Sequence, residues 1–144
     1  MQNILPRIAT ITDKYLNMNK NHDENEIVND RVELAALNIY LSGDVNKKRK
    51  EADIDEFNAK KKELEVYSEC RRGEMSIKDA EVQAKYDAME YELKAIETRA
   101  EARRYQLVHS SVEKLLDALS SKIKALEAEK VRSNYQTWKN QQFH

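Results

Sequence analysis

The stretch that decides the fold runs from Ser76 to Ser133 and reads SIKDAEVQAKYDAMEYELKAIETRAEARRYQLVHSSVEKLLDALSSKIKALEAEKVRS. It contains neither glycine nor proline, the residues that most readily interrupt a helix. Its apolar side chains recur at alternating steps of four and three residues, the heptad spacing of a helix that packs along one seam. Ser76, with Asp79 three residues later, forms a weak capping box at the expected N-terminus. We therefore predict one long helix whose seam also mediates oligomerisation. The predicted seam residues are Val82, Tyr86, Met89, Leu93, Ile96, Val108, Val112, Leu115, Leu119, Ile123 and Leu126.

The seam has one irregularity, near Arg103. After Ala100, the next position expected to be apolar is occupied by Arg103. The apolar pattern resumes at Val108, which is two steps of four residues after Ala100. Such an insertion is a stutter, which locally unwinds a supercoil. The alternative is a kink, or a tight bend near Arg103 that separates two helices.

Shorter helices are expected N-terminal to this stretch. The first is expected to begin near Arg7, because the fixed φ of Pro6 suits a first helical turn. The asparagine-rich segment 17–25 is then predicted to be a linker. The second helix spans 26–41 and is expected to end at Gly43, which can adopt a left-handed cap.

A third shorter helix is expected over 45–72, before a second break at Gly73. Its apolar stripe is thin for a helix of this length. The stripe consists of Ile54, Phe57, Leu64 and Tyr67.

Composition excludes several protein classes. The chain has 144 residues, 25 Lys and Arg against 26 Asp and Glu, and only two glycines. So few glycines exclude most small folds with many tight turns, as well as dinucleotide-binding and P-loop motifs. Cys70 is the only cysteine and cannot form an internal disulfide or a thiolate zinc site, which is typical of a reducing cytosol. No apolar run approaches the ~20 residues of a membrane span, and no signal-peptide pattern is present, so we expect a cytoplasmic protein without a membrane partner.

The length of the main helix favours self-association. A helix of about 57 residues is ~85 Å long, whereas a compact domain of this size has a radius of gyration of only ~14–15 Å. The remaining segments cannot cover the whole seam, and an uncovered apolar stripe is an association site. We predict an all-α, elongated, coiled-coil protein that assembles as a homo-oligomeric bundle. Its expected parts are 1–25 (short helix and linker), 26–133 (oligomerisation and binding) and 134–144 (tail).

The sequence offers little for catalysis. His22, His109 and His144 are the only histidines, and none lies four residues from another histidine or from Cys70. Carboxylates alternate with lysine and arginine, as they do on a solvated helix surface. We expect no enzyme activity, no metal site and no cofactor.

Short basic runs in 45–72 suggest a nucleic-acid surface. At 100° per residue, four cations from Lys47 to Arg72 fall within ~60° of one another along ~37 Å of helix, a spacing suited to a phosphate backbone. Tyr67 lies on another part of the helix surface, where a base could stack if the helix bends. Acidic residues are almost as numerous, so a salt-bridged, solvated helix is the alternative. The candidate nucleic-acid-binding residues are Lys47, Lys50, Lys60, Lys61, Lys62, Tyr67, Arg71 and Arg72.

The last segment, 134–144, reads NYQTWKNQQFH and carries three spaced aromatic residues. Tyr135 and Trp138 are neighbours at i, i+3 if the helix continues. We expect these rings either to cap the bundle or to dock on a partner. The third aromatic residue is Phe143.

Parts of 27–131 resemble the UvsY family of phage recombination mediators. That family carries a helix ending in a basic-x-basic-Leu-x-aromatic-Tyr-Ser pattern, then a short break and a long amphipathic helix. Here the stretch reads KKELEVYS over 61–68, and Lys61, Leu64, Tyr67 and Ser68 match the pattern. Similar residues also occur upstream (LNIY, 37–40) and downstream (LLDALSSKIK, 115–124). The chain departs from the family at Glu63, Val66 and Glu69, which stand where a basic residue, an aromatic residue and a glycine are usual.

The resemblance implies an oligomer that binds single-stranded DNA. Such mediators help a RecA-like recombinase displace a single-strand-binding protein, and by this likeness Lys61 would contact phosphate. It also implies a site of action in the cytoplasm of a bacterial host, if the chain is phage-encoded. The alternative hypothesis is a non-enzymatic coiled-coil scaffold, virion component or inhibitor that binds a protein partner.

Overall fold

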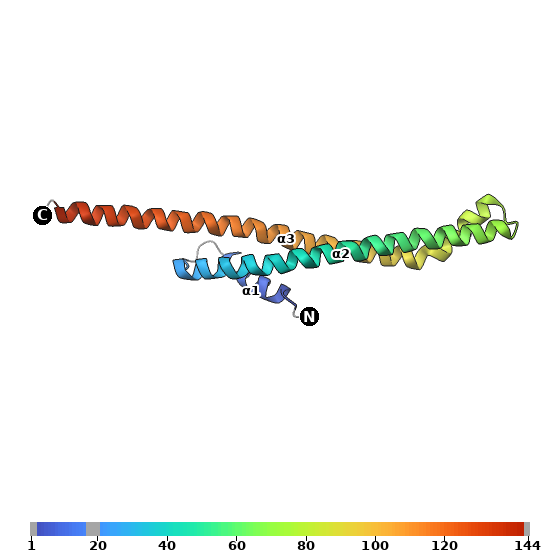
Figure 1. Cartoon of the computed structure of the whole chain (residues 1–144), viewed down its shortest axis with the longest axis horizontal. Helices are drawn as coiled ribbons and strands as arrows, with labels where there is room; N and C mark the ends of the chain where they lie inside the picture. The colour runs from blue at the N-terminus through green and yellow to red at the C-terminus, as the bar shows by residue number, and fades with distance from the viewer. Residues whose placement is uncertain (1–2, 17–20, 143–144) are drawn as a thin grey trace. The chain divides into compact units, whose positions relative to one another are not determined.

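The computed structural model describes residues 3–16 and 21–142, which form three helices and no strand (Figure 1). Helix α1 spans Leu5–Leu16, α2 spans Glu24–Arg72 and α3 spans Ile77–Gln142. The predicted all-α class is therefore confirmed, as is the long C-terminal helix. Helix α1 begins at Leu5, two residues before the expected start near Arg7, and the side-chain oxygen of Asn3 accepts a hydrogen bond from the Leu5 amide at 3.1 Å.

Helix α3 is continuous past Arg103, so the alternative of two helices is wrong. It also continues through the predicted tail as far as Gln142, and Phe143 lies outside the described residues. Helix α2 begins at Glu24, inside the predicted linker, of which 17–20 lie outside the described residues.

The predicted break at Gly43 is also wrong, because α2 passes through this residue without interruption. Gly43 does not have a positive φ, so it takes no left-handed cap. Buried Leu41 and Val45 flank it and keep one face of the helix packed. A single glycine inside a helix costs only ~1 kcal/mol, which this packing offsets.

The second predicted break, at Gly73, is confirmed, but the left-handed residue is Glu74, with a φ of 62°. The Met75 amide donates to the Cys70 carbonyl at 3.1 Å, and the Glu74 amide donates to the Arg71 carbonyl at 3.2 Å. This pair of hydrogen bonds is a Schellman motif, in which the residue after the cap adopts the left-handed conformation. The motif ends α2, and the Ser76 hydroxyl then accepts a hydrogen bond from the Asp79 amide at 3.2 Å, as the capping box predicts.

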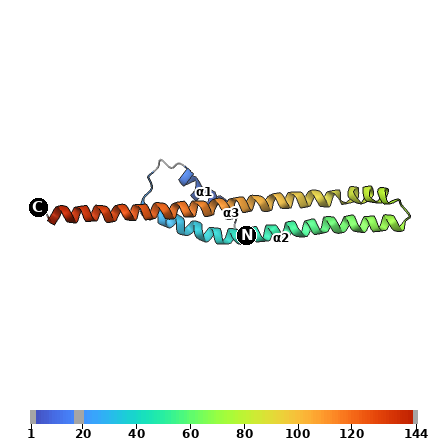
Figure 2. The ribbon, with the colours of Figure 1, turned by 90° about the horizontal axis from the view of Figure 1, so that it is seen from above.

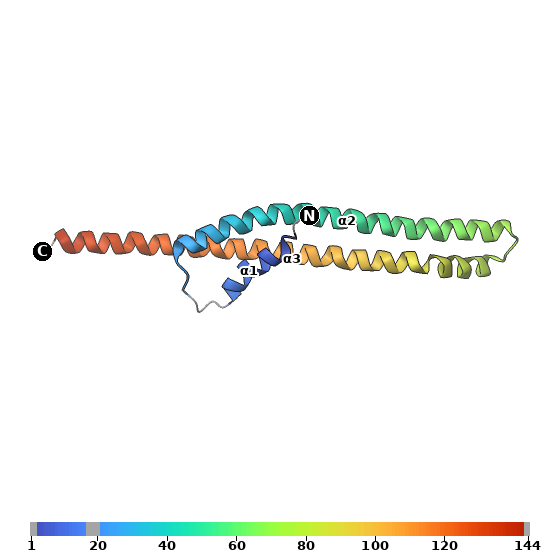
Figure 3. The ribbon, with the colours of Figure 1, turned by 90° about the horizontal axis from the view of Figure 1, so that it is seen from below.

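The chain divides into two compact units. Unit 1 consists of Met1–Leu41 and His109–His144, and unit 2 of Ser42–Val108. Unit 1 contains α1, the first part of α2 and the second part of α3 (Figure 3). Its core is made of large aliphatic side chains. The buried apolar residues of unit 1 are Ile8, Ile11, Ile27, Leu34, Leu41, Val112 and Leu119.

Polar contacts attach α1 to α2 in unit 1. Arg7 forms a bidentate ion pair with Glu33, at 2.5 and 2.7 Å. The buried carboxylate of Asp30 accepts a hydrogen bond from the Tyr15 hydroxyl at 2.6 Å and lies 3.2 Å from Lys14 Nζ. Partial burial, together with the adjacent Asp30, raises the pKa of Tyr15. The hydroxyl therefore stays protonated and continues to donate to Asp30.

Unit 2 is an antiparallel hairpin of α2 and α3, joined by the turn at Gly73 (Figure 2). Small side chains close the interface between its helices. Such residues let two helix backbones approach closely but bury little apolar area each. The buried apolar residues of unit 2 are Val45, Ala52, Ala59 and Val66 from α2, and Ala80, Ala84, Ala88, Ala95 and Ala102 from α3.

The large apolar residues that the sequence suggested as a seam do not enter this interface. Tyr86 is 70% exposed, Leu93 55% and Ile96 64%. Instead, heptad-spaced burial in α3 runs through Ala88, Ala95 and Ala102 in unit 2. Buried Val112 and Leu119 in unit 1 continue the same three-and-four spacing without an insertion, so no stutter is required. The four remaining seam residues are half-buried. They are Val108, the last residue of unit 2, and Leu115, Ile123 and Leu126 in unit 1.

Candidate nucleic-acid interface

The face of α2 that points away from the alanine interface of unit 2 is both basic and apolar. Helical geometry places its members roughly 120–240° around α2 from Ala52 and Ala59. All its members are exposed and follow one another at steps of three or four residues, apart from a longer step across Ser68. We call this surface the outer α2 face. It consists of Lys47, Lys50, Ile54, Phe57, Lys61, Leu64 and Arg72.

The cations of the outer α2 face are largely available for a ligand. Among the described residues, Lys47, Lys50 and Arg72 make no ion pair. Lys61 Nζ lies 3.9 Å from a Glu65 carboxylate oxygen, and both side chains are more than half exposed. An exposed pair of this kind contributes at most ~1 kcal/mol, so an incoming phosphate can replace the carboxylate.

A shallow groove of about 540 Å³ runs along this face. It combines an exposed aromatic ring, aliphatic surface and three cations with two carboxylates, those of Glu65 and Glu69. An aromatic ring beside cations is what proteins use to follow a single strand and stack its bases. Phe57 is 65% exposed, so its ring is accessible. The groove is lined by Phe57, Lys60, Lys61, Leu64, Glu65, Ser68, Glu69 and Arg72.

The run Lys60, Lys61 and Lys62 does not form one surface. Successive residues of a helix diverge by ~100°, so only Lys61 belongs to the outer α2 face. Lys60 is exposed on one flank of the helix and also reaches the groove. Lys62 is half-buried towards the other flank. Of these three predicted residues, the structure brings Lys60 and Lys61 to the groove and leaves Lys62 apart.

Tyr67 and Arg71 are also apart from the outer α2 face. Tyr67 is half-buried beside α3, in a pocket of about 380 Å³ shared with Glu63 and Glu81. Lys60 and Leu64 also line this pocket, but Tyr67 does not line the groove along the outer α2 face. Arg71 Nη1 donates a hydrogen bond to the Met75 carbonyl at 2.9 Å and so supports the turn between the helices.

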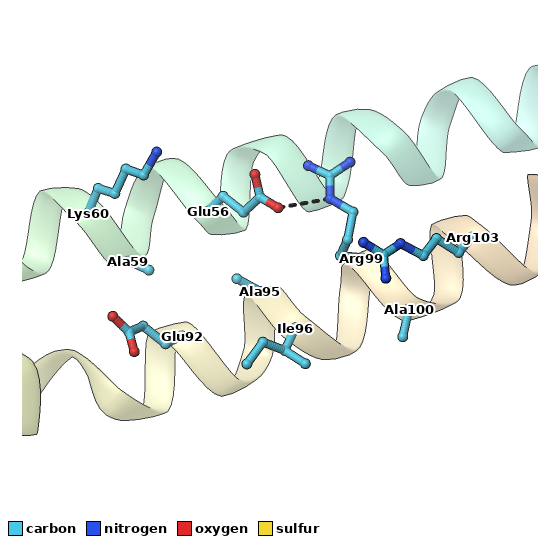
Figure 4. A pocket seen from close by; sticks show the side chains of 9 residues that line it. All are labelled: Glu56, Ala59, Lys60, Glu92, Ala95, Ile96, Arg99, Ala100 and Arg103. Carbon is cyan, nitrogen blue, oxygen red and sulfur yellow. Dashed lines mark hydrogen bonds and ion pairs between the residues drawn. The ribbon is translucent and has the colours of Figure 1, made fainter.

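Other cations of unit 2 hold the hairpin together. Arg99 lies 2.8 Å from Glu56 (Figure 4) and 2.5 Å from Asp53, and these two carboxylates raise its pKa. The same hydrogen bond from Arg99 lowers the pKa of Glu56. Lys48 Nζ lies 3.2 Å from Glu101. Arg99 and Lys48 each pair with carboxylates of the opposite helix. Lys47 and Lys50 differ from them, because they make no ion pair among the described residues.

Figure 4 also shows how closely the helices approach, with Ala59 and Ala95 facing each other across the gap. Arg99 and Arg103 rise from α3 beside a pocket of about 480 Å³, and Ile96 points away from α2. The direction of Ile96 agrees with its 64% exposure. The large side chains of α3 thus form a second exposed surface in unit 2, which we call the outer α3 stripe. It consists of Val82, Tyr86, Met89, Leu93 and Ile96.

Sequence reasoning missed Phe57 and Leu64 as partners of the lysines, because it assigned them to a core stripe. The spacing already indicated this, since Phe57 lies four residues before Lys61 and Leu64 lies three residues after it, which places all three on one face of a helix. The deciding information was that Ala52, Ala59 and Val66 form the buried side of the helix.

Within the described residues, no group of His, Cys, Asp and Glu is arranged to hold a metal ion. His109 is engaged by Asn38 at 2.8 Å and by Glu113 at 3.1 Å. None of the described helices combines the length and the apolar character that crossing a membrane requires. Comparison with family models, curated proteins and solved structures found no match for this chain.

Proposed function

We propose that this chain is a non-enzymatic homo-oligomer that binds single-stranded DNA and acts as a recombination mediator, helping to load a RecA-like recombinase. The observation that supports DNA binding is the outer α2 face, where Lys47, Lys50 and Arg72 have no ion-pair partner among the described residues and Phe57 is exposed. The recombinase and the single-strand-binding protein enter the proposal through the resemblance over 61–68.

The outer α2 face suits a flexible single strand. Phosphates lie along the cations, and a base stacks on Phe57, which needs no hydrogen bonding to base edges. This recognition tolerates any sequence, as a mediator that acts on arbitrary single strands requires. Because each phosphate contact releases a condensed counterion, we expect affinity to fall steeply with salt.

Self-association strengthens such a site. One chain offers only a few cations, whereas linked copies bind one strand with an avidity well above that of each copy. The outer α3 stripe is the proposed contact between copies, because its five large apolar side chains are all 49–70% exposed. Packing this stripe against a second α3 is the coiled-coil contact that we propose for the oligomer.

The test replaces the cations of the outer α2 face. The variant Lys47→Gln/Lys50→Gln/Lys61→Gln is compared with Lys78→Gln/Lys85→Gln/Lys114→Gln, which removes the same charge from exposed lysines of α3. Binding of a labelled single strand is measured by fluorescence anisotropy over a range of salt concentrations. We expect the first variant to bind about tenfold or more weakly, with a salt slope lowered by ~0.7 for each lost phosphate contact.

Equal losses in both triple variants would show that binding depends on overall charge and would remove the outer α2 face from the proposal. Absence of single-strand binding by the unaltered protein at low salt would overturn the function. That second result would favour a scaffold that binds a protein partner.

A further inference from the structure

The C-terminal part of α3 extends beyond its last contact with α2 in unit 1. That contact is the ion pair between Lys130 and Glu24, at 2.5 Å. Every described residue from 131 to 142 is exposed, yet this segment is helical and regular. It therefore presents side chains that the core of unit 1 does not use.

Two aromatic rings dominate this segment. Tyr135 is 58% exposed and Trp138 is 55% exposed. Their ring centroids lie 6.1 Å apart with an angle of 32° between the planes. Neither ring caps the core of unit 1, so their packing is with each other and with solvent. Two adjacent exposed rings of this kind are platforms on which successive bases stack.

The charge around the rings has one sign. Arg132 and Lys139 share about 120° of the helix circumference with Tyr135 and Trp138. Neither cation makes an ion pair within the described residues. The sequence contains no Asp or Glu from residue 130 onward, and the remaining side chains are mostly amides and hydroxyls.

We infer that this face, made of Arg132, Tyr135, Trp138 and Lys139, is a second site for single-stranded nucleic acid, separate from the outer α2 face. Bases stack on the two rings while phosphates lie against the two cations. The choice of single-stranded nucleic acid as the ligand rests on the proposed function. The choice of these four residues as a site rests only on their exposure and charge. The absence of acidic side chains from residue 130 onward, beside two exposed rings and two cations, matches the negative charge and the stacking bases of a single-stranded nucleic acid.

Trp138 is the only tryptophan of the chain, so its fluorescence reports on this site alone. The full-length protein is titrated with fluorescently labelled oligothymidylate, and tryptophan emission and oligonucleotide anisotropy are recorded together. We expect emission to be quenched in step with the rise in anisotropy. The outer α2 variant Lys47→Gln/Lys50→Gln/Lys61→Gln should still show quenching at saturating oligonucleotide, because the two sites are separate.

Ring variants supply the matched comparison. Tyr135→Leu/Trp138→Leu is expected to weaken binding about fivefold or more, whereas Tyr135→Phe/Trp138→Phe, which keeps two stacking rings, stays within about twofold of the unaltered protein. Circular dichroism checks that α3 remains helical in both. For the cations, Arg132→Gln/Lys139→Gln should weaken binding more than the control Lys122→Gln/Lys124→Gln.

Three results would overturn the inference. Oligonucleotide binding without any change in Trp138 emission would remove this face and leave the outer α2 face as the site. Equal affinity of the leucine and phenylalanine variants would show that stacking does not contribute. Absence of all oligonucleotide binding would overturn both this site and the proposed function.

Discussion

Alanine side chains set the distance between the two helices of unit 2. Ala88, Ala95 and Ala102 recur every seven residues in α3 and are at most 6% exposed. On α2, Ala52 and Ala59 have the same spacing and are equally buried. A larger side chain at any of these positions has no volume to occupy unless the helices separate.

Enlarging one alanine should therefore destabilise unit 2. We expect Ala95→Leu to lower the free energy of unfolding by about 1–3 kcal/mol, the usual cost of overpacking. Ala100→Leu is the control, since Ala100 is exposed on the same helix and should cost nothing. Urea denaturation followed by circular dichroism measures both. A larger loss for Ala100→Leu would contradict the observed interface.

Arg99 and its two carboxylates make the hairpin sensitive to acid. Because Arg99 lowers the pKa of Glu56, the ionised form of Glu56 is favoured in the folded state. Its stabilising contribution is complete above the unfolded-state pKa of 4.5 and disappears as the pH falls through the lower folded-state value. Acidification below pH 4.5 should therefore weaken the hairpin.

Comparing Glu56→Gln with the unaltered chain isolates this effect. The variant should be less stable at neutral pH and lose less stability between neutral pH and pH 3. Glu90→Gln, which removes an exposed carboxylate with no ion pair among the described residues, should follow the unaltered protein. Thermal unfolding at a series of pH values measures the difference. Parallel pH profiles for all three proteins would show that the Glu56–Arg99 contact contributes nothing.

Helix α2 shows how a packed face overrides a local helix breaker. The glycine at position 43 lies in the helix interior, and an added Cβ would meet no atom within 4 Å. The residue therefore contributes only its backbone flexibility, which disfavours the helix. At the other end of α2 the helix does stop, because Glu74 adopts a left-handed conformation and the turn hydrogen bonds form.

Replacing Gly43 distinguishes a helix interior from a cap. We expect Gly43→Ala to raise the stability of the protein by about 0.5–1 kcal/mol, because alanine has the higher helix propensity and the added methyl group has room. Chemical denaturation measures the change. Destabilisation by a similar amount would mean that Gly43 adopts the left-handed cap expected from the sequence alone.

At the scale of the whole molecule, the two units differ in how they bury apolar surface. Unit 1 buries isoleucine and leucine side chains, whereas unit 2 buries mostly alanine and leaves its largest apolar residues in solvent. Hydrophobic stabilisation scales with the apolar area removed from water, so the alanine interface contributes less per residue. Unit 2 therefore gains hydrophobic stabilisation when a second copy of the chain covers the outer α3 stripe.

This difference predicts that unit 2 drives self-association. We expect Leu93→Ser/Ile96→Ser to lower the average mass measured by light scattering at micromolar concentration while helix content is retained. The control Phe57→Ser/Leu64→Ser removes two equally exposed apolar side chains from the outer α2 face and should leave the mass unchanged. A purely monomeric unaltered protein, or an equal loss in both variants, would contradict the outer α3 stripe as the contact.

The sequence by itself determined that the chain is helical, that α3 is long, and where α1 begins and α2 ends. Local chemistry decides these features: a region free of glycine and proline continues as a helix, and proline and capping residues mark ends. Lys47, Lys50, Lys61 and Arg72 could likewise be grouped from spacing alone, because helical geometry is the same wherever the helix packs.

Only the tertiary structure decided which face of each helix is inside. In α3 the chain offers two stripes at heptad spacing, one of large side chains around Leu93 and one of alanines around Ala95. Hydrophobicity favours the first, but the close approach of α2 and α3 admits only the second, because small side chains let the backbones meet. That choice turns Phe57 outward beside Lys61 and leaves the outer α3 stripe uncovered. Which side of a helix is buried depends on what its partner helix can accommodate, and a single helix does not contain that information.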